Sequence, residues 1–319
     1  MKKCTMLINQ KSSKYDAKKI ETCKSIIKEH GYLPTLVFCK HDNFIKNFYE
    51  DAKKANETSD LVITYGGDGF FGLYQDILNK EGQKALTSHV PMGTANDMAL
   101  NLGTSKRMIE ATETLLHGEI KERDIITSNN SAFGYVSTFG PITNIPYDTP
   151  KKLKKLGPAG YLIAAMPDII KIITRHYKPY EITVKANEKE KQLECLIGAV
   201  SNAKGFAGVE IFQNSDQNDG KFEVLLIKPQ LIKKAPKLIK DFSKALIGKK
   251  ETNLNIFENY ENEIECFKTS DLQLSFNEVP KKHFDNDGDK GPLLMPGETI
   301  TYQAKGKCKL LLPKTLPVK

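Results

Sequence analysis

The chain of 319 residues contains no tryptophan, and no two of its cysteines form a C-x-x-C pair. The lack of a C-x-x-C pair argues against a zinc site and against a disulfide framework, so we expect reduced thiols in a cytoplasmic protein. Because the lysines are dispersed and no aromatic-basic motif of the usual modules occurs, a nucleic-acid partner is not expected. The six cysteines are Cys4, Cys23, Cys39, Cys195, Cys266 and Cys308.

No apolar run is long enough to cross a membrane. The longest candidate, residues 160–166, is ended by Pro167 and Asp168. The apolar stretch at residues 6–8 is too short for a signal peptide and predicts a first strand instead. Any membrane contact is therefore expected to be peripheral, at the inner face of the membrane.

Lysine and arginine outnumber aspartate and glutamate by 47 to 39, which gives a formal net charge of +8. Such an excess favours anionic partners, for example nucleotide phosphates or an anionic membrane surface, but a mildly basic solvated surface explains it equally well. A chain of this length with 39% apolar residues exceeds one ordinary domain. Two domains with a cleft between them are therefore expected.

Residues 1–126 alternate short apolar runs with amphipathic stretches. Such alternation predicts a parallel α/β sheet with helices on both faces. The expected strands cover residues 6–8, 36–38, 61–65 and the region of Val90, and the expected helices cover residues 18–30 and 43–55.

Residues 127–304 have a different sequence pattern, in which short runs of alternating apolar and polar residues are separated by Asn, Asp, Gly and Lys. This pattern is typical of antiparallel strands. Two basic amphipathic stretches, residues 150–173 and 231–249, interrupt it, and each suits either packing on the core or contact with a membrane. The expected strands cover residues 133–138, 180–184, 193–200, 222–227 and 272–276.

The first chemically informative segment is residues 61–72, with the sequence LVITYGGDGFFG. Glycine lets backbone N–H groups approach phosphate oxygens, and the N-terminus of the helix that follows adds its positive end. A carboxylate in this turn repels phosphate unless Mg²⁺ lies between them, so Asp68 indicates a metal-bridged nucleotide. Gly-Gly-Asp-Gly is also an ordinary turn sequence.

A second segment, residues 91–103 with the sequence PMGTANDMALNLG, has the same organisation. It follows an apolar strand and opens a helix, although capping alone explains Thr94 or Asn96 at that place. Two parallel strands that both end in glycine and a carboxylate place a binding site at the carboxyl edge of the sheet. The Walker sequence G-x-x-x-x-G-K-[ST] is absent.

Gly-Gly-Asp-Gly followed at this distance by Pro-x-Gly-Thr-x-Asn-Asp resembles the catalytic domain of diacylglycerol kinases and related lipid kinases. Similarity to bacterial members continues at residues 151–166, at residues 218–222 and at residues 287–289, where Asp-Gly-Asp replaces the family's Asp-Gly-Glu. The resemblance implies an α/β fold with a Rossmann-like ATP-binding domain, residues 1–126, and a β-sandwich lipid-binding domain, residues 127–304. A tail, residues 305–319, would pack back on the first domain.

The resemblance also implies site residues. Asp289 falls on the family's general base, which accepts the proton of the lipid hydroxyl, and Asp68 and Asp97 are the other expected catalytic carboxylates. The expected ligands of a structural Mg²⁺ are the side chain of Asp219 and the carbonyls of Asp216 and Lys221. The residues expected to bind ATP are Asn9, Gln10, Lys11, Ser12, Ser13, Gly66, Gly67, Asp68, Gly69, Phe70, Phe71, Gly72, Thr94 and Asn96.

The sequence departs from the family pattern at the phosphate site. Phe70 replaces a Thr, and Gly72-Leu73 replaces Asn-Glu. Gln10 and Ser13 stand where the first loop of the family has Pro and Gly. If Phe70 faces the phosphates, Phe70→Thr is expected to tighten ATP binding about tenfold, because a hydrogen bond to a charged group is worth about 1.5–3 kcal/mol. If Phe70 lies in the core, the substitution costs stability instead.

We therefore expect a lipid kinase that uses ATP and Mg²⁺ to phosphorylate a lipid hydroxyl, in the first place that of diacylglycerol, at a membrane surface. NAD kinases and phosphofructokinases also use Gly-Gly-Asp-Gly, but residues 91–97 and 287–289 fit lipid kinases better. A non-catalytic lipid- or nucleotide-binding module of the same fold is the second alternative, because Phe70 replaces the Thr. The sequence fixes neither the lipid nor the oligomeric state, for which a homodimer is one option.

Overall fold

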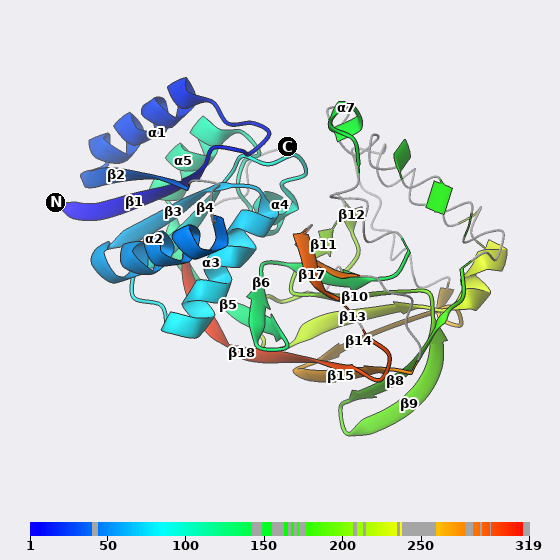
Figure 1. Ribbon diagram of the computed structural model, residues 1–319. Coiled ribbons are helices and arrows are strands. Elements are labelled where there is room, and N and C mark those ends of the chain that lie inside the picture. The colour runs from blue at the N-terminus through cyan, green and yellow to red at the C-terminus, as the bar shows by residue number, and fades with distance from the viewer. Residues whose placement is uncertain are drawn as a thin grey trace. The chain divides into compact units, whose positions relative to one another are not determined.

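The computed structural model describes residues 1–39, 44–141, 149–154, 163–164, 167–168, 171, 177–206, 209–212, 215–234, 237, 260–277, 283–287, 289–293 and 295–314. The chain divides into two compact units (Figure 1). The first comprises Met1–Ile125 with Lys305–Lys319, and the second comprises Ile126–Ala304.

The first unit is built on a parallel sheet with the strand order β2-β1-β3-β4. The C-terminal part of β18 (Thr299–Leu312) continues this sheet beside β4, where Leu310 pairs with Thr87. The parallel sheet predicted from the sequence, with helices on both faces, is confirmed (Figure 1). Its strands are β1 (Lys2–Asn9), β2 (Tyr32–Cys39), β3 (Leu61–Gly66) and β4 (Leu86–Pro91), and its helices are α1 (Ala17–Glu29), α2 (Phe44–Thr58), α3 (Asp68–Glu81), α4 (Asp97–Asn101) and α5 (Met108–Leu116).

Helices α1 and α5 cover one face of this sheet. Ile20, Cys23 and Ile27 of α1 recur at helical spacing and are buried, and they belong to the same apolar cluster as Met6 and Ile8 of β1. Burying one such side chain contributes about 1.5–3 kcal/mol. Because α2 and α3 cover the other face (Figure 1), the central strand β3 is buried on both sides. It therefore reads as a continuous apolar run rather than an alternating one.

A buried histidine, His89, lies in β4 of this unit. Its Nδ1 is 2.9 Å from the Thr64 hydroxyl, and its ring packs against the ring of Phe71 with centroids 4.9 Å apart. Burial lowers the pKa of His89 from 6.5 to about 3. The imidazole is therefore neutral in the folded protein at neutral and mildly acidic pH.

The stability of the protein is expected to fall as the pH falls below 6.5. The unfolded chain then binds a proton at His89 that the folded chain does not bind until about pH 3. Between pH 7 and pH 5 this difference removes about 2 kcal/mol of the free energy of unfolding. Urea unfolding of the wild type and of His89→Gln at pH 7 and pH 5 measures this loss of unfolding free energy. An equal loss in the two proteins would contradict the assignment.

The described part of the second unit consists of antiparallel strands, most of which belong to two large sheets, with one further two-stranded sheet. One sheet has the order β14-β13-β10-β7-β16-β17, and β15, β8 and β9 lie beyond β18 in the other. The strands are β5 (Glu119–Ser128), which begins in the first unit, β6 (Ser131–Phe133), β7 (Val136–Phe139), β8 (Tyr180–Ala186), β9 (Lys189–Cys195), β10 (Ile197–Ser201), β11 (Gly205–Phe206), β12 (Val209–Glu210), β13 (Phe222–Ile227), β14 (Ile264–Thr269), β15 (Asp271–Phe276), β16 (His283–Asn286) and β17 (Asp289–Leu293). A short helix α7 (Lys151–Lys154) and a 3₁₀ turn (Pro229–Lys234) complete the described elements.

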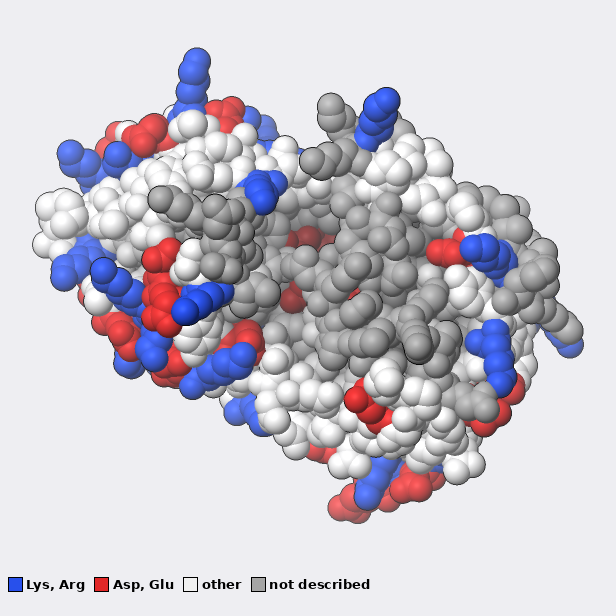
Figure 2. Space-filling view, in the orientation of Figure 1, with Lys and Arg blue, Asp and Glu red and all other residues white. Residues whose placement is uncertain are grey.

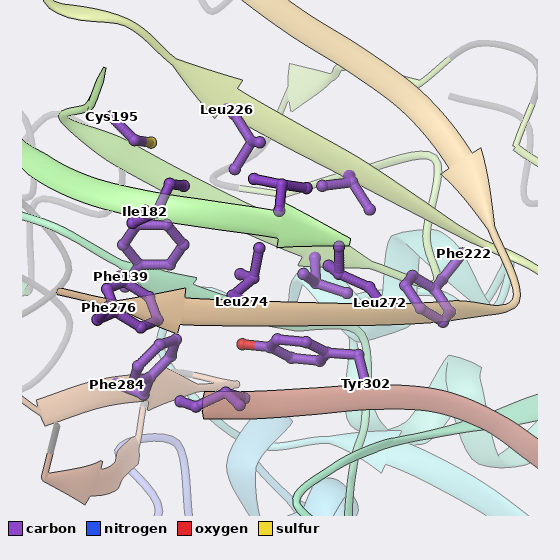
Figure 3. Packing of buried hydrophobic residues seen from close by; sticks show 14 of the residues in the cluster. Phe139, Ile182, Cys195, Phe222, Leu226, Leu272, Leu274, Phe276, Phe284 and Tyr302 are labelled. Atoms are coloured by element: carbon purple, nitrogen blue, oxygen red, sulfur yellow. The ribbon is translucent and has the colours of Figure 1, made fainter. Parts of the chain in front are cut away.

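The core of the second unit lies between these two sheets (Figure 3). Phe139 of β7 and Phe284 of β16 come from one sheet, and Phe276 of β15 comes from the other. Phe276 meets Phe139 edge-to-face, with ring centroids 5.1 Å apart, and meets Phe284 at 5.8 Å. Aromatic side chains from facing sheets thus interdigitate, which is the arrangement of a β-sandwich.

Two of the predicted strands are wrong in extent. The run at residues 133–138 is divided into β6 and β7 at Gly134 and Tyr135, whose N–H groups bond to a side chain instead of a strand. The run at residues 193–200 is divided at Leu196, so that β9 pairs in one sheet and β10 in the other. The predicted helix at 231–249 begins as a 3₁₀ turn, and most of it lies outside the described residues, as does most of 150–173.

Among the described residues, no helix combines the length and apolar character needed to cross a membrane. On the face shown in Figure 2, lysine and arginine side chains are interspersed with aspartate and glutamate. The positive net charge of +8 is therefore not gathered into one patch on that face.

Candidate functional site

Three loops of the first unit meet at the carboxyl ends of β1, β3 and β4. The loops after β3 and β4 are joined by a hydrogen bond of 2.6 Å from the Met92 N–H to the Gly66 carbonyl. Their backbones also touch: a Cβ atom added to Gly93 would lie 2.6 Å from the Gly67 Cα. No side chain fits at position 93, so glycine is required there by the approach of the two loops to each other.

Asp68 connects the same two loops through its side chain. Its Oδ2 accepts the N–H of Asp97 at 3.2 Å, and its Oδ1 accepts the N–H of Met98 at 2.9 Å. Asp68 is thus the first residue of α3 and at the same time an acceptor for the N-terminus of α4. Both Asp68 and Asp97 are buried. Two carboxylates and the N-termini of two helices are therefore gathered at one edge of the sheet.

Asn96 shapes the loop after β4. It has left-handed backbone angles, with φ 56° and ψ 44°, and its side chain is buried. Its Oδ1 accepts the Gly93 N–H at 2.8 Å, and its Nδ2 donates to the Gly93 carbonyl at 3.0 Å. Because the amide bonds to Gly93 in both directions, the Asn96 side chain holds the loop after β4 in shape.

The loop after β1 is tied to the loop after β4. The Lys14 N–H donates to the Met92 carbonyl at 3.1 Å, and the hydroxyl of Thr94 donates to that of Ser13 at 3.0 Å. Within the loop, Asn9 Oδ1 accepts the Lys11 N–H at 3.0 Å. Ser13 therefore makes the contact to Thr94 from the position where the family has glycine. The structure thus brings together the predicted ATP residues of all three loops.

Two lysines near these loops were not among the predicted site residues. Burial and the charge of Lys106 lower the pKa of Lys14, while the charge of Asp68 acts in the opposite direction. Lys106 Nζ donates to the Ala95 carbonyl at 3.1 Å. Lys14 and Lys106 thus interact electrostatically, and Lys14 also interacts with Asp68. Two neighbouring ammonium groups of this kind suit the binding of phosphate. Nothing in the sequence distinguishes these two lysines from the many others.

The side chains of Phe70 and Phe71 do not face a nucleotide, and this part of the sequence-based site is corrected. Phe70 is 4% exposed, and its ring packs against the ring of Phe48 with centroids 4.8 Å apart. Phe71 is fully buried. The absence of a side chain at Gly66 leaves room for the Phe70 ring. In this segment only the backbone at the start of α3, which has no side-chain cap, is suited to receive phosphate oxygens.

Phe70→Thr is therefore expected to destabilise the protein by about 3 kcal/mol, because it leaves a cavity beside Phe48 and buries a hydroxyl. The tenfold gain in ATP affinity considered from the sequence is not expected. Thermal unfolding and ATP titration of both proteins measure the two effects. Tighter ATP binding at an unchanged melting temperature would contradict the placement of Phe70 in the core.

In the second unit, Asp287 organises the segment that contains the predicted base. Its carboxylate accepts three successive N–H groups: that of Gly134, that of Tyr135 at 2.8 Å and that of Val136 at 3.1 Å. Its own N–H donates to the Val136 carbonyl at 2.9 Å. Asp289 follows as the first residue of β17 and pairs with Asn286; its side chain lies outside what the structure describes. The sequence motif does not reveal that Asp287 anchors these three backbone N–H groups.

The predicted metal ligands lie in the turn before β13, also in the second unit. Asp216 Oδ1 accepts the Asn218 N–H at 3.0 Å, and Asp219 Oδ1 accepts the Lys221 N–H at 3.0 Å. Glu223 follows in β13 and is buried, which raises the pKa of its carboxyl group, although the charge of Lys268 acts in the opposite direction.

Comparison with known proteins finds a family match over the first unit. Residues 3–128 match the family model described as the diacylglycerol kinase catalytic domain. The resemblance to the diacylglycerol kinase family is confirmed. The matched residues include all three loops of the first unit.

Diacylglycerol kinases are also the named relatives of the chain. That of Bacillus subtilis (strain 168) is 26% identical over 244 residues, which are 76% of this chain and 74% of the relative. That of Staphylococcus saprophyticus is 24% identical over 181 residues, so the alignment spans only 58% of that protein. A crystal structure of a diacylglycerol kinase from Bacillus anthracis str. Sterne aligns with a TM-score of 0.73 and 19% identity, covering 98% of this chain and 97% of that chain. At 19% identity this structural likeness supports the two-domain fold alone.

Proposed function

We propose that the chain is a lipid kinase that transfers the γ-phosphate of ATP to the hydroxyl group of diacylglycerol. The observation that carries the proposal is the direct contact between the loops after β3 and β4, which we call the joint. In it, Asp68 accepts N–H groups from the start of α4, and Gly67 contacts Gly93. The joint presents an uncapped helix N-terminus and buried carboxylates at one strand edge. Similarity to proteins named diacylglycerol kinase supports the choice of substrate.

In this proposal the phosphates of ATP lie along the backbone of Gly66–Gly69, and Thr94, held by Ser13, contacts the nucleotide. Lys14 and Lys106 offset part of the phosphate charge. Phosphoryl transfer demands mainly positioning and charge neutralisation, which rigid loops and fixed charges supply.

Asp68 and Asp97 are the residues that would hold Mg²⁺. Asp68 accepts the N–H groups of Asp97 and Met98. A carboxylate offers about four acceptor sites in all, so bonds of this kind are compatible with binding a metal ion or a metal-bound water. When bound, Mg²⁺ would neutralise charge on the transferred phosphoryl group. The N–H groups of Asp97 and Met98 keep the carboxylate of Asp68 in one orientation, which limits the reorganisation needed on binding.

Asp289 would accept the proton of the lipid hydroxyl as the new phosphate ester bond forms and the bond from the γ-phosphorus to the leaving oxygen of ADP breaks. Aspartate is one methylene shorter than the family's glutamate, so its backbone must sit closer to the hydroxyl. The three N–H bonds of Asp287 fix the backbone two residues before this base. Contact with the membrane that holds the lipid would be peripheral.

Incubation of the protein with γ-labelled ATP, Mg²⁺ and a panel of acceptors tests the proposal. The panel comprises diacylglycerol, phosphatidylglycerol, a long-chain base and NAD. Label is expected in the organic phase with diacylglycerol. Label on NAD would favour the other kinase class, and ATP binding without label on any acceptor would favour a non-catalytic module.

A further inference from the structure

The turn before β13 fixes its own backbone with carboxylates. Asp216 and Asp219 each accept the N–H two residues ahead, and Gly220 adopts a left-handed conformation with φ 71°. Such side-chain bonds stabilise a turn without an external ligand. One oxygen of Asp219, Oδ1, is therefore already used by the Lys221 N–H.

The other oxygen of Asp219 is used by a lysine from the next strand. Lys268 Nζ lies 2.9 Å from Asp219 Oδ2. The position of Lys268 follows from the register of β13 and β14, in which Glu223 and Lys268 are direct partners. An antiparallel pair places such side chains next to each other on the same face. The pairing of β13 with β14 therefore places the ammonium group of Lys268 beside the turn that contains Asp219.

The same ammonium group serves a second carboxylate. Lys268 Nζ lies 3.4 Å from Glu223 Oε1, and the Glu223 side chain is only 4% exposed. Within the part of the chain that the structure describes, neither oxygen of Glu223 makes a hydrogen bond of good geometry, although Ser215 and Lys268 lie close enough to lower the pKa of its carboxyl group. A buried carboxylate needs a cation nearby, and here the nearby cation is Lys268.

The arrangement does not fit the structural Mg²⁺ that the resemblance implies at Asp219. Mg²⁺ requires an octahedron of about six oxygens at about 2.1 Å, whereas Asp219 Oδ2 is bonded to an ammonium group. Lys268 already satisfies the need for positive charge between Asp219 and Glu223.

We propose that Lys268 replaces the structural divalent cation in this chain, so that the turn at residues 216–220 and strands β13 and β14 are held together by an internal ammonium group. The chain then needs no metal ion for the stability of its second unit. This proposal concerns stability and stands independently of the proposed kinase activity.

Thermal unfolding of the full chain tests the proposal with metal alone as the probe. The melting temperature of the wild type is expected to be the same in EDTA and in millimolar Mg²⁺ or Ca²⁺. Lys268→Met, which keeps the apolar stem, is expected to lower it by about 3–6 °C in EDTA. Mg²⁺ or Ca²⁺ should then raise the melting temperature of the variant, because Asp219 and Glu223 are left without their cation.

Two further variants separate this effect from a general loss of charge. Lys234→Met removes the partner of Glu263, another ion pair of the second unit with a distance of 2.7 Å, and should create no response to divalent cations. Adding Glu223→Gln to Lys268→Met should restore much of the stability and abolish the response. A wild type that loses stability in EDTA and regains it with Mg²⁺ would overturn the proposal, as would a Lys268→Met variant as stable as the wild type.

Discussion

Asp68→Asn is expected to reduce lipid phosphorylation roughly 1000-fold, which corresponds to about 4 kcal/mol of transition-state stabilisation. The substitution removes the negative charge proposed to hold Mg²⁺ beside the glycine loop but keeps the size and shape of the side chain. The asparagine oxygen can still accept one of the two N–H groups that Asp68 accepts from α4. Its NH₂ group must face the other, so stability should fall by about 1–3 kcal/mol.

Initial rates with labelled ATP, together with melting temperatures, measure both effects. Asp76→Asn is the matched control, because Asp76 lies on the same helix α3 and pairs with Lys80 near the surface. It should turn over like the wild type. Asp68→Asn with wild-type turnover would contradict the metal-bridging role. Alanine is the less informative substitution, since it leaves both buried N–H groups of α4 without an acceptor.

Asp287→Ala is expected to lower the free energy of unfolding by about 4 kcal/mol. Three neighbouring backbone N–H groups, those of Gly134, Tyr135 and Val136, lose their charged acceptor at once. Each buried donor left unsatisfied costs about 1–3 kcal/mol, and Asp287 is buried. Turnover should fall as well, because the backbone leading to Asp289 is no longer anchored.

Urea unfolding of the wild type and of the variant measures the loss. Asp271→Ala is the matched control in the second unit: Asp271 is exposed, and its carboxylate accepts a bond of 3.1 Å from Gln303. It should have little effect on stability. A loss for Asp287→Ala no greater than that for Asp271→Ala would show that the three bonds do not hold this segment in place.

Much of the first unit could be predicted because each of its elements carries its own signal. The run Leu61–Gly66 is apolar because β3 is buried on both faces, and the glycines that follow it end the strand. The antiparallel unit was harder, since the signal of an alternating run does not mark where a strand leaves one sheet for the other. Leu196 lies within such a run, yet β9 and β10 on either side of it pair in different sheets.

The side-chain partners of the site residues could not be predicted, because they depend on contacts between distant parts of the chain. Asp68 bonds to N–H groups 29 and 30 residues ahead, and Asp287 bonds to N–H groups 151–153 residues behind. The motif also does not fix which way residue 70 points. Only the packing of α3 against Phe48 of α2 places the Phe70 ring in the core.

The place of Phe70 bears on the non-catalytic alternative. That alternative rests on the replacement of the family's Thr by Phe70. With the ring in the core, what the chain lacks at this site relative to the family is the hydroxyl of the Thr and the carboxylate of the Asn-Glu pair. The backbone at the start of α3 and the carboxylate of Asp68 are in place. We therefore expect turnover, at a rate lowered by the missing hydroxyl and the missing carboxylate.

The measurement that tests the central claim most directly follows the phosphate itself. Wild-type protein and Asp68→Asn are incubated with vesicles that contain diacylglycerol and with ATP labelled at either the γ- or the α-phosphate. The proposed function predicts labelled phosphatidic acid from γ-labelled ATP only, and only with the wild type. Absence of a labelled lipid from the wild type, while ATP still binds, would contradict it.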